Sequence, residues 1–183
     1  TPILQTPLDL GADLVIHSAT KYIDGQGRVL GGLILGKKEL IAEVRFFTRH
    51  TGPSLSPFNA WILSKSMETL ALRMDRHCEN AEKVARYFEG CPHLEKVNYP
   101  FLPSHAQHDL AIKQMKAGGG ILTLTVKGGL QRAQRFIDKL QMISITPNLG
   151  DSRSIVTHPA STTHSKLSAE ERQQVEIGRA SCR

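Results

Sequence analysis

The sequence predicts an α/β protein with one sheet near its N-terminus and a smaller sheet after a long helical stretch. Three observations lead to this prediction. Residues 13–18 and 29–36 are apolar runs without alternation, which is typical of strands covered on both faces in a parallel or mixed sheet. Residues 56–92 repeat apolar positions at helical spacing. From residue 94 onward strands and helices alternate, which predicts a sheet with helices on one face.

Local signals set the bounds of the elements in the first part. Residues 3–12 predict a short helix before the first strand, and the letters DGQGR at 24–28 predict a glycine-rich turn between the two strands. Residues 37–52 predict a helix that stops before Pro53. The stretch at 56–92 is expected to be one long or kinked helix that bridges two domains.

The long stretch has clear end signals. Ser56 fits the N-cap and Pro57 the first turn, while Gly90 and Pro92 end the helix. The later elements are expected in the order strand 94–100, helix 108–116, strand 119–128, helix 130–140, strand 143–148, loop-rich segment 148–168 and a capped helix that starts at Ser168.

Composition narrows the classes of function. The formal net charge is +6, but the basic residues alternate with acids at helical spacing, as in MDRHCENAEKVAR (74–86). That pattern predicts a solvated helix face and no nucleic-acid partner.

No apolar run reaches the length of about 18 residues that a membrane span needs, and no signal peptide is recognised. The cysteines, Cys78, Cys91 and Cys182, form no paired framework, which favours reduced thiols in the cytoplasm. The histidines form no metal motif.

The hexapeptide HSATKY follows the first strand and raises a specific chemistry. Ser18 and Thr20 lie two residues apart, so in extended backbone their hydroxyls point the same way, as two donors to a phosphate would. Lys21 follows at the sheet edge, where α/β folds bind ligands. Its amine could neutralise a phosphate or form a Schiff base with a carbonyl. Taken alone, the motif also fits hydroxyls that satisfy a strand end and a lysine that extends to water.

A second polar segment is NLGDSRSIVTHPASTTH at 148–164. By spacing alone it reads as a polar surface loop that caps the next helix. Its histidines, His158 and His164, lack a carboxylate partner at a useful spacing, so no acid–base role is expected of them. The glycines at 118–120 read as a turn, since a strand follows them and a phosphate-binding loop would open a helix.

Four segments together resemble the Cys/Met-metabolism family of pyridoxal-phosphate enzymes, over residues 1 to about 175. They are PLDLGADLVIHSATKYIDGQGRVLGG, GPSLSPFNAWILSKSMETLALRMDRHCENA, GGGILTLTVKGG and NLGDSRSIVTHPASTTH. Within the family they are most similar to the O-succinylhomoserine sulfhydrylases. The resemblance implies a fragment of a fold-type I transferase: the edge of the large cofactor-domain sheet in 1–66, a bridging helix, and a smaller αβ C-terminal domain in 67–175.

The resemblance also implies roles for single residues. Lys21 would hold pyridoxal 5′-phosphate as a Schiff base and, once freed, act as general base and acid. The hydroxyls of Ser18 and Thr20 would bind the cofactor phosphate. Asn148 would contact the substrate carboxylate, and the segment from Thr157 onward would shape the pocket. No metal is implied.

The implied activity is a γ-replacement in methionine biosynthesis, in which O-succinylhomoserine and sulfide give homocysteine. Cystathionine γ-synthase, O-acetylhomoserine sulfhydrylase and γ-lyase activities are alternatives within the family. A non-catalytic interaction domain that keeps the fold is the alternative from another class. The family implies a homotetramer built from dimers, a small amino-acid substrate and a sulfur donor, with no membrane partner.

The sequence departs from the family at both ends. The family's remaining cofactor ligands precede the position of Thr1, and the arginine of its RLSVG motif, which binds the substrate carboxylate, has no match. The pattern breaks after Val175 into EIGRASCR, so neither Arg179 nor Arg183 is given that role. We interpret 176–183 as an aberrant tail left by cloning, sequencing or assembly, and we expect the 183 residues alone to be inactive.

Overall fold

The computed structural model describes residues 2–174 and 181–182, which form two compact units. Unit 1 comprises Thr1–Met74 together with Gly150–Ser152, and unit 2 comprises Asp75–Leu149 and Arg153–Arg183. The division falls inside helix α3 (Leu70–Phe88). A domain boundary after residue 66 stays a prediction, and most of the tail at 176–183 lies outside the described residues.

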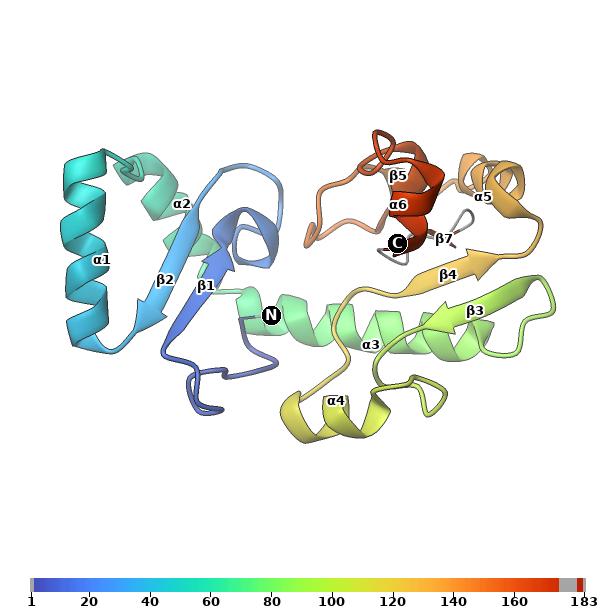
Figure 1. Cartoon of the computed structure of the whole chain (residues 1–183), viewed down its shortest axis with the longest axis horizontal. Helices are drawn as coiled ribbons and strands as arrows, with labels where there is room; N and C mark the ends of the chain where they lie inside the picture. The colour runs from blue at the N-terminus through green and yellow to red at the C-terminus, as the bar shows by residue number, and fades with distance from the viewer. Residues whose placement is uncertain (1, 175–180, 183) are drawn as a thin grey trace. The chain divides into compact units, whose positions relative to one another are not determined.

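Unit 1 contains a two-stranded sheet of β1 (Leu14–Ser18) and β2 (Gly32–Gly36), which lie side by side in Figure 1. The strands pair antiparallel without a bulge. The prediction that both faces are covered is wrong for the described chain, because Ile16 is 75% exposed and Ile34 42%. Among the described residues, each strand has the other as its sole partner in this sheet.

One helix lies beside this sheet. Helix α1 (Lys38–Thr51) lies beside β2 and ends before Pro53, as predicted, and its C-cap Gly52 has the left-handed conformation. The predicted helix at 3–12 is wrong, because the segment folds as separate turns at 2–4 and 7–11. Pro7 lacks an N–H and cannot continue a helix from the residues before it.

The long helical stretch is two helices. Helix α2 (Pro57–Met67) starts at Ser56, whose hydroxyl accepts a hydrogen bond from Asn59 N at 3.1 Å, so the predicted N-cap is confirmed. The break follows at Glu68 and Thr69, whose N–H groups bond three residues back at 3.3 Å. Such tighter turns are typical of helix ends. The chain then continues into α3.

Unit 2 is built on short strands. Strand β3 (Leu94–Asn98) pairs antiparallel with β4 (Thr123–Val126), which also pairs with β7 (Ser181–Cys182). Strands β5 (Ser144–Ile145) and β6 (Ile155–Val156) form a separate parallel pair. The predicted strands at 94–100, 119–128 and 143–148 are therefore confirmed, with shorter bounds.

Helices of unit 2 carry its core. They are α4 (His108–Gln114), α5 (Gly129–Asp138), the 3₁₀ turn η2 (Pro159–Ser161) and α6 (Ala169–Gln174). One cluster joins Ala133 and Ile137 of α5 to Val126 and Val156, and another joins Ala81 and Ala85 of α3 to Tyr99 and Leu102. At the start of α6, Ser168 and Glu171 exchange two hydrogen bonds, which confirms the predicted capping box.

The outer face of α3 is charged, as the sequence predicted. Glu79 pairs with Arg76 at 3.2 Å and with Lys83 at 2.6 Å, and the hydrogen bond from Lys83 lowers the pKa of that carboxyl.

Cys78 and Cys91 are free thiols, and burial raises the pKa of Cys78. Among the described residues, none of the helices combines the length and apolar character that crossing a bilayer requires.

Candidate active site

The chain turns sharply where β1 ends. Ala19–Ile23 form a single π-helical turn, η1, in which Asp24 N donates a hydrogen bond to Ala19 O at 2.9 Å. The backbone at Lys21 departs from helical geometry, with φ −89° and ψ −122°. Ala19 is fully buried, and its N–H donates to Gly31 O at 2.8 Å. The start of the turn is therefore anchored to the segment that enters β2.

Of the three residues predicted as a site, Ser18 ends β1, and Thr20 and Lys21 lie in η1. The Thr20 hydroxyl accepts a hydrogen bond from Gly31 N at 3.1 Å and reaches Gly31 O at 3.4 Å. Ser18 is exposed, and its hydroxyl has no protein partner among the described residues. The half-buried Lys21 likewise forms no ion pair or side-chain hydrogen bond within the part of the chain that the structure describes. One amine and one hydroxyl are thus available to a ligand.

An ion pair between a buried carboxylate and a partly exposed arginine supports the end of the turn. The Asp24 side chain is fully buried and accepts hydrogen bonds from Arg28 Nε at 3.0 Å and Arg28 N at 2.7 Å. Arg28 Nη2 also donates to the Ser66 hydroxyl at 2.6 Å. A buried carboxylate needs this degree of compensation. The predicted glycine-rich turn at 24–28 therefore contains an ion pair, and the hydrogen bond of Arg28 to Ser66 connects this turn to α2.

A second arginine reaches the turn from α3. Arg73 donates from Nη1 to Tyr22 O at 2.7 Å and from Nη2 to Ile23 O at 3.2 Å. Burial lowers the pKa of its guanidinium, and Asp24 acts in the opposite direction. The side chain therefore bonds the two carbonyls that directly follow Lys21.

The segment at 150–152 packs against the other side of the same turn. Ser152 N donates to Gly25 O at 2.7 Å. Gly150 has φ +84°, and a Cβ there would lie 2.5 Å from Tyr22 N and 2.9 Å from the carbonyl carbon of Lys21. A side chain at this position would collide with the peptide that carries the lysine. Gly150 is thus required by both its conformation and its contact.

The other predicted residues lie in unit 2. Asn148 is half-buried, and its backbone N–H contacts the Thr146 hydroxyl at 3.5 Å. Thr157 is 7% exposed, and its hydroxyl bonds that of Thr162 at 2.9 Å. The predicted role of Asn148 stays a prediction, as does that of the segment around Thr157. Asn148 comes two residues before Gly150 in the chain.

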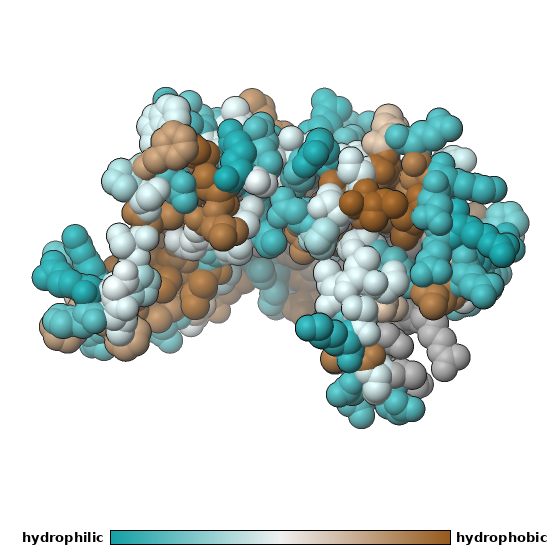
Figure 2. Space-filling model, turned by 90° about the horizontal axis from the view of Figure 1, so that it is seen from above, coloured by the Kyte–Doolittle hydropathy of each residue, from teal (hydrophilic) through white to brown (hydrophobic). Residues whose placement is uncertain are grey.

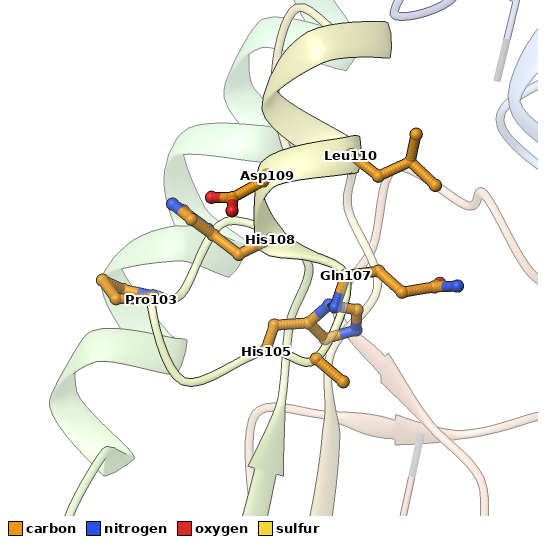
Figure 3. Close-up of a pocket in the computed structure, with 7 residues that line it drawn as sticks. Pro103, His105, Gln107, His108, Asp109 and Leu110 are labelled. Carbon is orange, nitrogen blue, oxygen red and sulfur yellow. The ribbon is translucent and has the colours of Figure 1, made fainter.

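A hollow of about 350 Å³ lies at the start of α4, and Figure 3 shows its lining. The side chains of His108 and Asp109 point to one side of the helix, and those of Gln107 and Leu110 to the other. The polar groups therefore do not converge on one ligand position. None of the predicted site residues lines this hollow. No cluster suited to a metal occurs among the described residues.

Sequence reasoning missed most of the residues that support the lysine turn. Asp24 and Arg28 had a weak signal, because an acid and a base four residues apart flank the glycines. Arg73 had none, since it lies 51 residues from the carbonyl that it bonds. Gly150 was noted as part of a polar loop without a reason for the glycine.

Comparison with known proteins gives consistent matches across the chain. The family described as "Cys/Met metabolism PLP-dependent enzyme" matches residues 1–183. The O-succinylhomoserine sulfhydrylase of Pseudomonas aeruginosa is 52% identical over 178 residues, which cover 97% of this chain and 44% of that protein. The L-methionine γ-lyase of Treponema denticola is 47% identical over 179 residues, or 97% of this chain and 45% of that protein.

Solved structures match the fold over the whole chain. The cystathionine γ-synthase of Xanthomonas oryzae pv. oryzae, solved with aminoacrylate and cysteine, superposes with a TM-score of 0.95 at 36% identity. The match covers 100% of this chain and 47% of that one. The chain therefore spans slightly less than half the length of these relatives.

Proposed function

Because this chain belongs to the family of Cys/Met metabolism PLP-dependent enzymes, we propose that the complete protein catalyses a γ-replacement on O-succinylhomoserine, with sulfide as the sulfur donor. The observation that carries the proposal is the amine of Lys21, which has no ion pair or side-chain hydrogen bond in the described chain although its turn is held from several sides. An amine placed in this way is ready to condense with an aldehyde.

The donor groups present suit pyridoxal phosphate. An aldehyde requires an unpaired amine, which Lys21 supplies. A phosphate requires hydroxyl or amide donors, and the Ser18 hydroxyl is available. The Thr20 hydroxyl uses an acceptor position for Gly31 N, while its contact to Gly31 O is long at 3.4 Å. Its proton can therefore turn toward a phosphate oxygen.

The chain's own residues have separate tasks in the proposed reaction. When bound, the cofactor supplies an electron sink for charge that develops at the substrate α-carbon. The Lys21 amine removes the α-proton and carries protons between carbon atoms. Asn148 contacts the substrate carboxylate. The bond between the γ-carbon and the ester oxygen breaks, succinate leaves, and hydrosulfide forms the new carbon–sulfur bond, so the overall step involves no oxidant or reductant.

A γ-lyase or a cystathionine γ-synthase is the second candidate. Methionine γ-lyase relatives at 42–47% identity support the first, and the solved cystathionine γ-synthase supports the second. Both would use Lys21 in the same way. They differ in what attacks the γ-carbon: a thiol of cysteine in the synthase, and no sulfur nucleophile in the lyase.

The products of the complete protein separate these candidates. Incubated with O-succinylhomoserine and sulfide, it is expected to release homocysteine and succinate, measured by mass spectrometry. Cystathionine from the same ester plus cysteine would favour the synthase, and release of 2-oxobutanoate and ammonia without a nucleophile would favour the lyase. Homocysteine formed faster from O-acetylhomoserine than from the succinyl ester would favour an O-acetylhomoserine sulfhydrylase. A protein that converts none of these substrates, with cofactor supplied, would contradict the enzyme proposal and favour an interaction domain.

The proposal concerns the complete protein. Since the chain spans less than half of its relatives, we expect the 183 residues alone to be inactive. We also expect the complete protein to work in the cytoplasm as a homotetramer built from dimers. Large apolar side chains exposed on α1 and α2, such as Phe46 at 66% and Phe58 at 65%, support a need for partner surfaces. Brown apolar residues are visible at the surface in Figure 2.

A further inference from the structure

We propose that Arg73 is a positioning residue for the Lys21 amine, because its guanidinium fixes the carbonyls of Tyr22 and Ile23 and thereby holds the turn that carries the lysine. The inference rests on the proposed function, since it concerns the residue that would bind the cofactor. The inference adds a residue of α3 to the site, and this residue lies outside the HSATKY motif.

The carbonyl oxygens from Lys21 to Gly25 all accept hydrogen bonds. In chain order the donors are Gly25 N (2.9 Å), Arg73 Nη1 (2.7 Å), Arg73 Nη2 (3.2 Å), Arg28 Nη2 (3.0 Å) and Ser152 N (2.7 Å). Arg73 thus supplies two of the five. An irregular turn cannot satisfy its own carbonyls as a longer helix does. The Lys21 carbonyl is bonded within the turn, and the next two carbonyls are fixed by a side chain from α3, whereas the Lys21 amine is left available.

Arg73 is itself held in place. Its Nη2 donates to Ser66 O at 3.0 Å and its Nε to the Thr69 hydroxyl at 3.2 Å, so the break between α2 and α3 orients the guanidinium. A Cβ at Gly25 would lie 2.6 Å from Arg73 Cζ. The glycine therefore leaves the space that the flat guanidinium fills.

The geometry requires a fork of donors and not merely a positive charge. The two acceptors belong to consecutive peptides, and Arg73 meets each with a different nitrogen. A planar guanidinium offers such donors in a fixed arrangement, whereas a lysine ammonium is a single compact group. Loss of the fork would free two carbonyls beside Lys21. The turn could then rotate, and the amine would sample positions away from the cofactor.

The test uses the complete protein and the variants Arg73→Gln and Arg73→Lys. Arg76→Gln is the matched control, because Arg76 lies on the same helix with a 70% exposed side chain paired to Glu79. Three quantities are measured: deuterium uptake by the peptide spanning 19–25 without cofactor, the rate at which borohydride traps pyridoxal phosphate on Lys21, and kcat and KM. Thermal unfolding reports whether each variant folds.

In Arg73→Gln we expect faster deuterium uptake over 19–25, and trapping and kcat lowered about tenfold to a hundredfold with a much smaller change in KM, as misplacement of a reacting group produces. Arg73→Lys should fall between this variant and the wild type, and Arg76→Gln should match the wild type. Wild-type uptake and trapping in Arg73→Gln would overturn the inference. If that variant does not fold, the same result in Arg73→Lys would overturn it.

Failure of the proposed function gives a different result. If the wild-type protein is not trapped at Lys21, the cofactor role of the lysine is wrong. The uptake comparison still decides whether Arg73 holds the turn, because it requires no cofactor. If deuterium uptake over 19–25 is the same in Arg73→Gln as in the wild type, and the wild type is trapped at Lys21, the role of Arg73 is contradicted and the proposed function is not.

Discussion

Replacing Lys21 with alanine is expected to lower the activity of the complete protein by about a hundredfold to ten-thousandfold through the loss of proton transfer alone. Loss of the covalent link to the cofactor adds to this effect. Stability should change little, since the Lys21 side chain forms no ion pair or hydrogen bond in the described chain. The measurements are kcat with O-succinylhomoserine and sulfide, and the absorbance of bound cofactor before and after substrate.

Two further variants separate the amine from its charge. Lys21→Arg keeps a positive charge but cannot condense with an aldehyde, so it should behave like Lys21→Ala. Lys65→Ala removes an exposed lysine of α2 that pairs with Glu68 at 2.7 Å, and it should retain wild-type activity. An active Lys21→Arg protein would show that the position supplies charge and not a nucleophile.

Replacing Gly150 with alanine is expected to have the second largest effect. At φ +84° any side chain is strained by about 1–2 kcal/mol. The added Cβ would also meet Tyr22 N at 2.5 Å and the carbonyl carbon of Lys21 at 2.9 Å. Both are backbone atoms, so the turn must shift, at a further cost of about 1–3 kcal/mol. We expect lower stability in urea and slower trapping of cofactor on Lys21.

Gly52→Ala is the matched control for this contact. Gly52 ends α1 at φ +90°, and a Cβ there would meet no atom within 4 Å. Its replacement should therefore cost about 1–2 kcal/mol through strain alone, with trapping at Lys21 unchanged. Equal losses of stability in the two variants, with normal trapping in both, would refute the account of Gly150.

The fold was predictable wherever neighbouring residues decide it. Ser56 identified the start of α2 and Pro53 the end of α1 from their own chemistry, and the apolar runs located β1 and β2. The family resemblance and the α/β class are confirmed. The exposure of Ile16 was not predictable, because it depends on what packs against that face of the sheet. The two-residue strands β6 and β7 are too short for their apolar pattern to be recognised.

The candidate site was predictable to the extent that it is contiguous. Ser18, Thr20 and Lys21 lie within one hexapeptide, which singled them out as candidates, and their roles toward the cofactor stay predictions. The groups that hold this hexapeptide come from distant positions. Arg73 reaches it from α3. Gly150 also contacts it, although Gly150 lies 76 residues after Met74, where the first stretch of unit 1 ends. Such contacts follow from packing, which no local pattern in the sequence records.

Peptide mapping after borohydride reduction tests the central claim most directly. The complete wild-type protein is incubated with pyridoxal 5′-phosphate, reduced, digested and analysed by mass spectrometry. We expect the phosphopyridoxyl group on the peptide that contains Lys21, at about one group per chain, with no comparable label on Lys65. Stoichiometric label on another lysine, with Lys21 unmodified, would contradict the assignment.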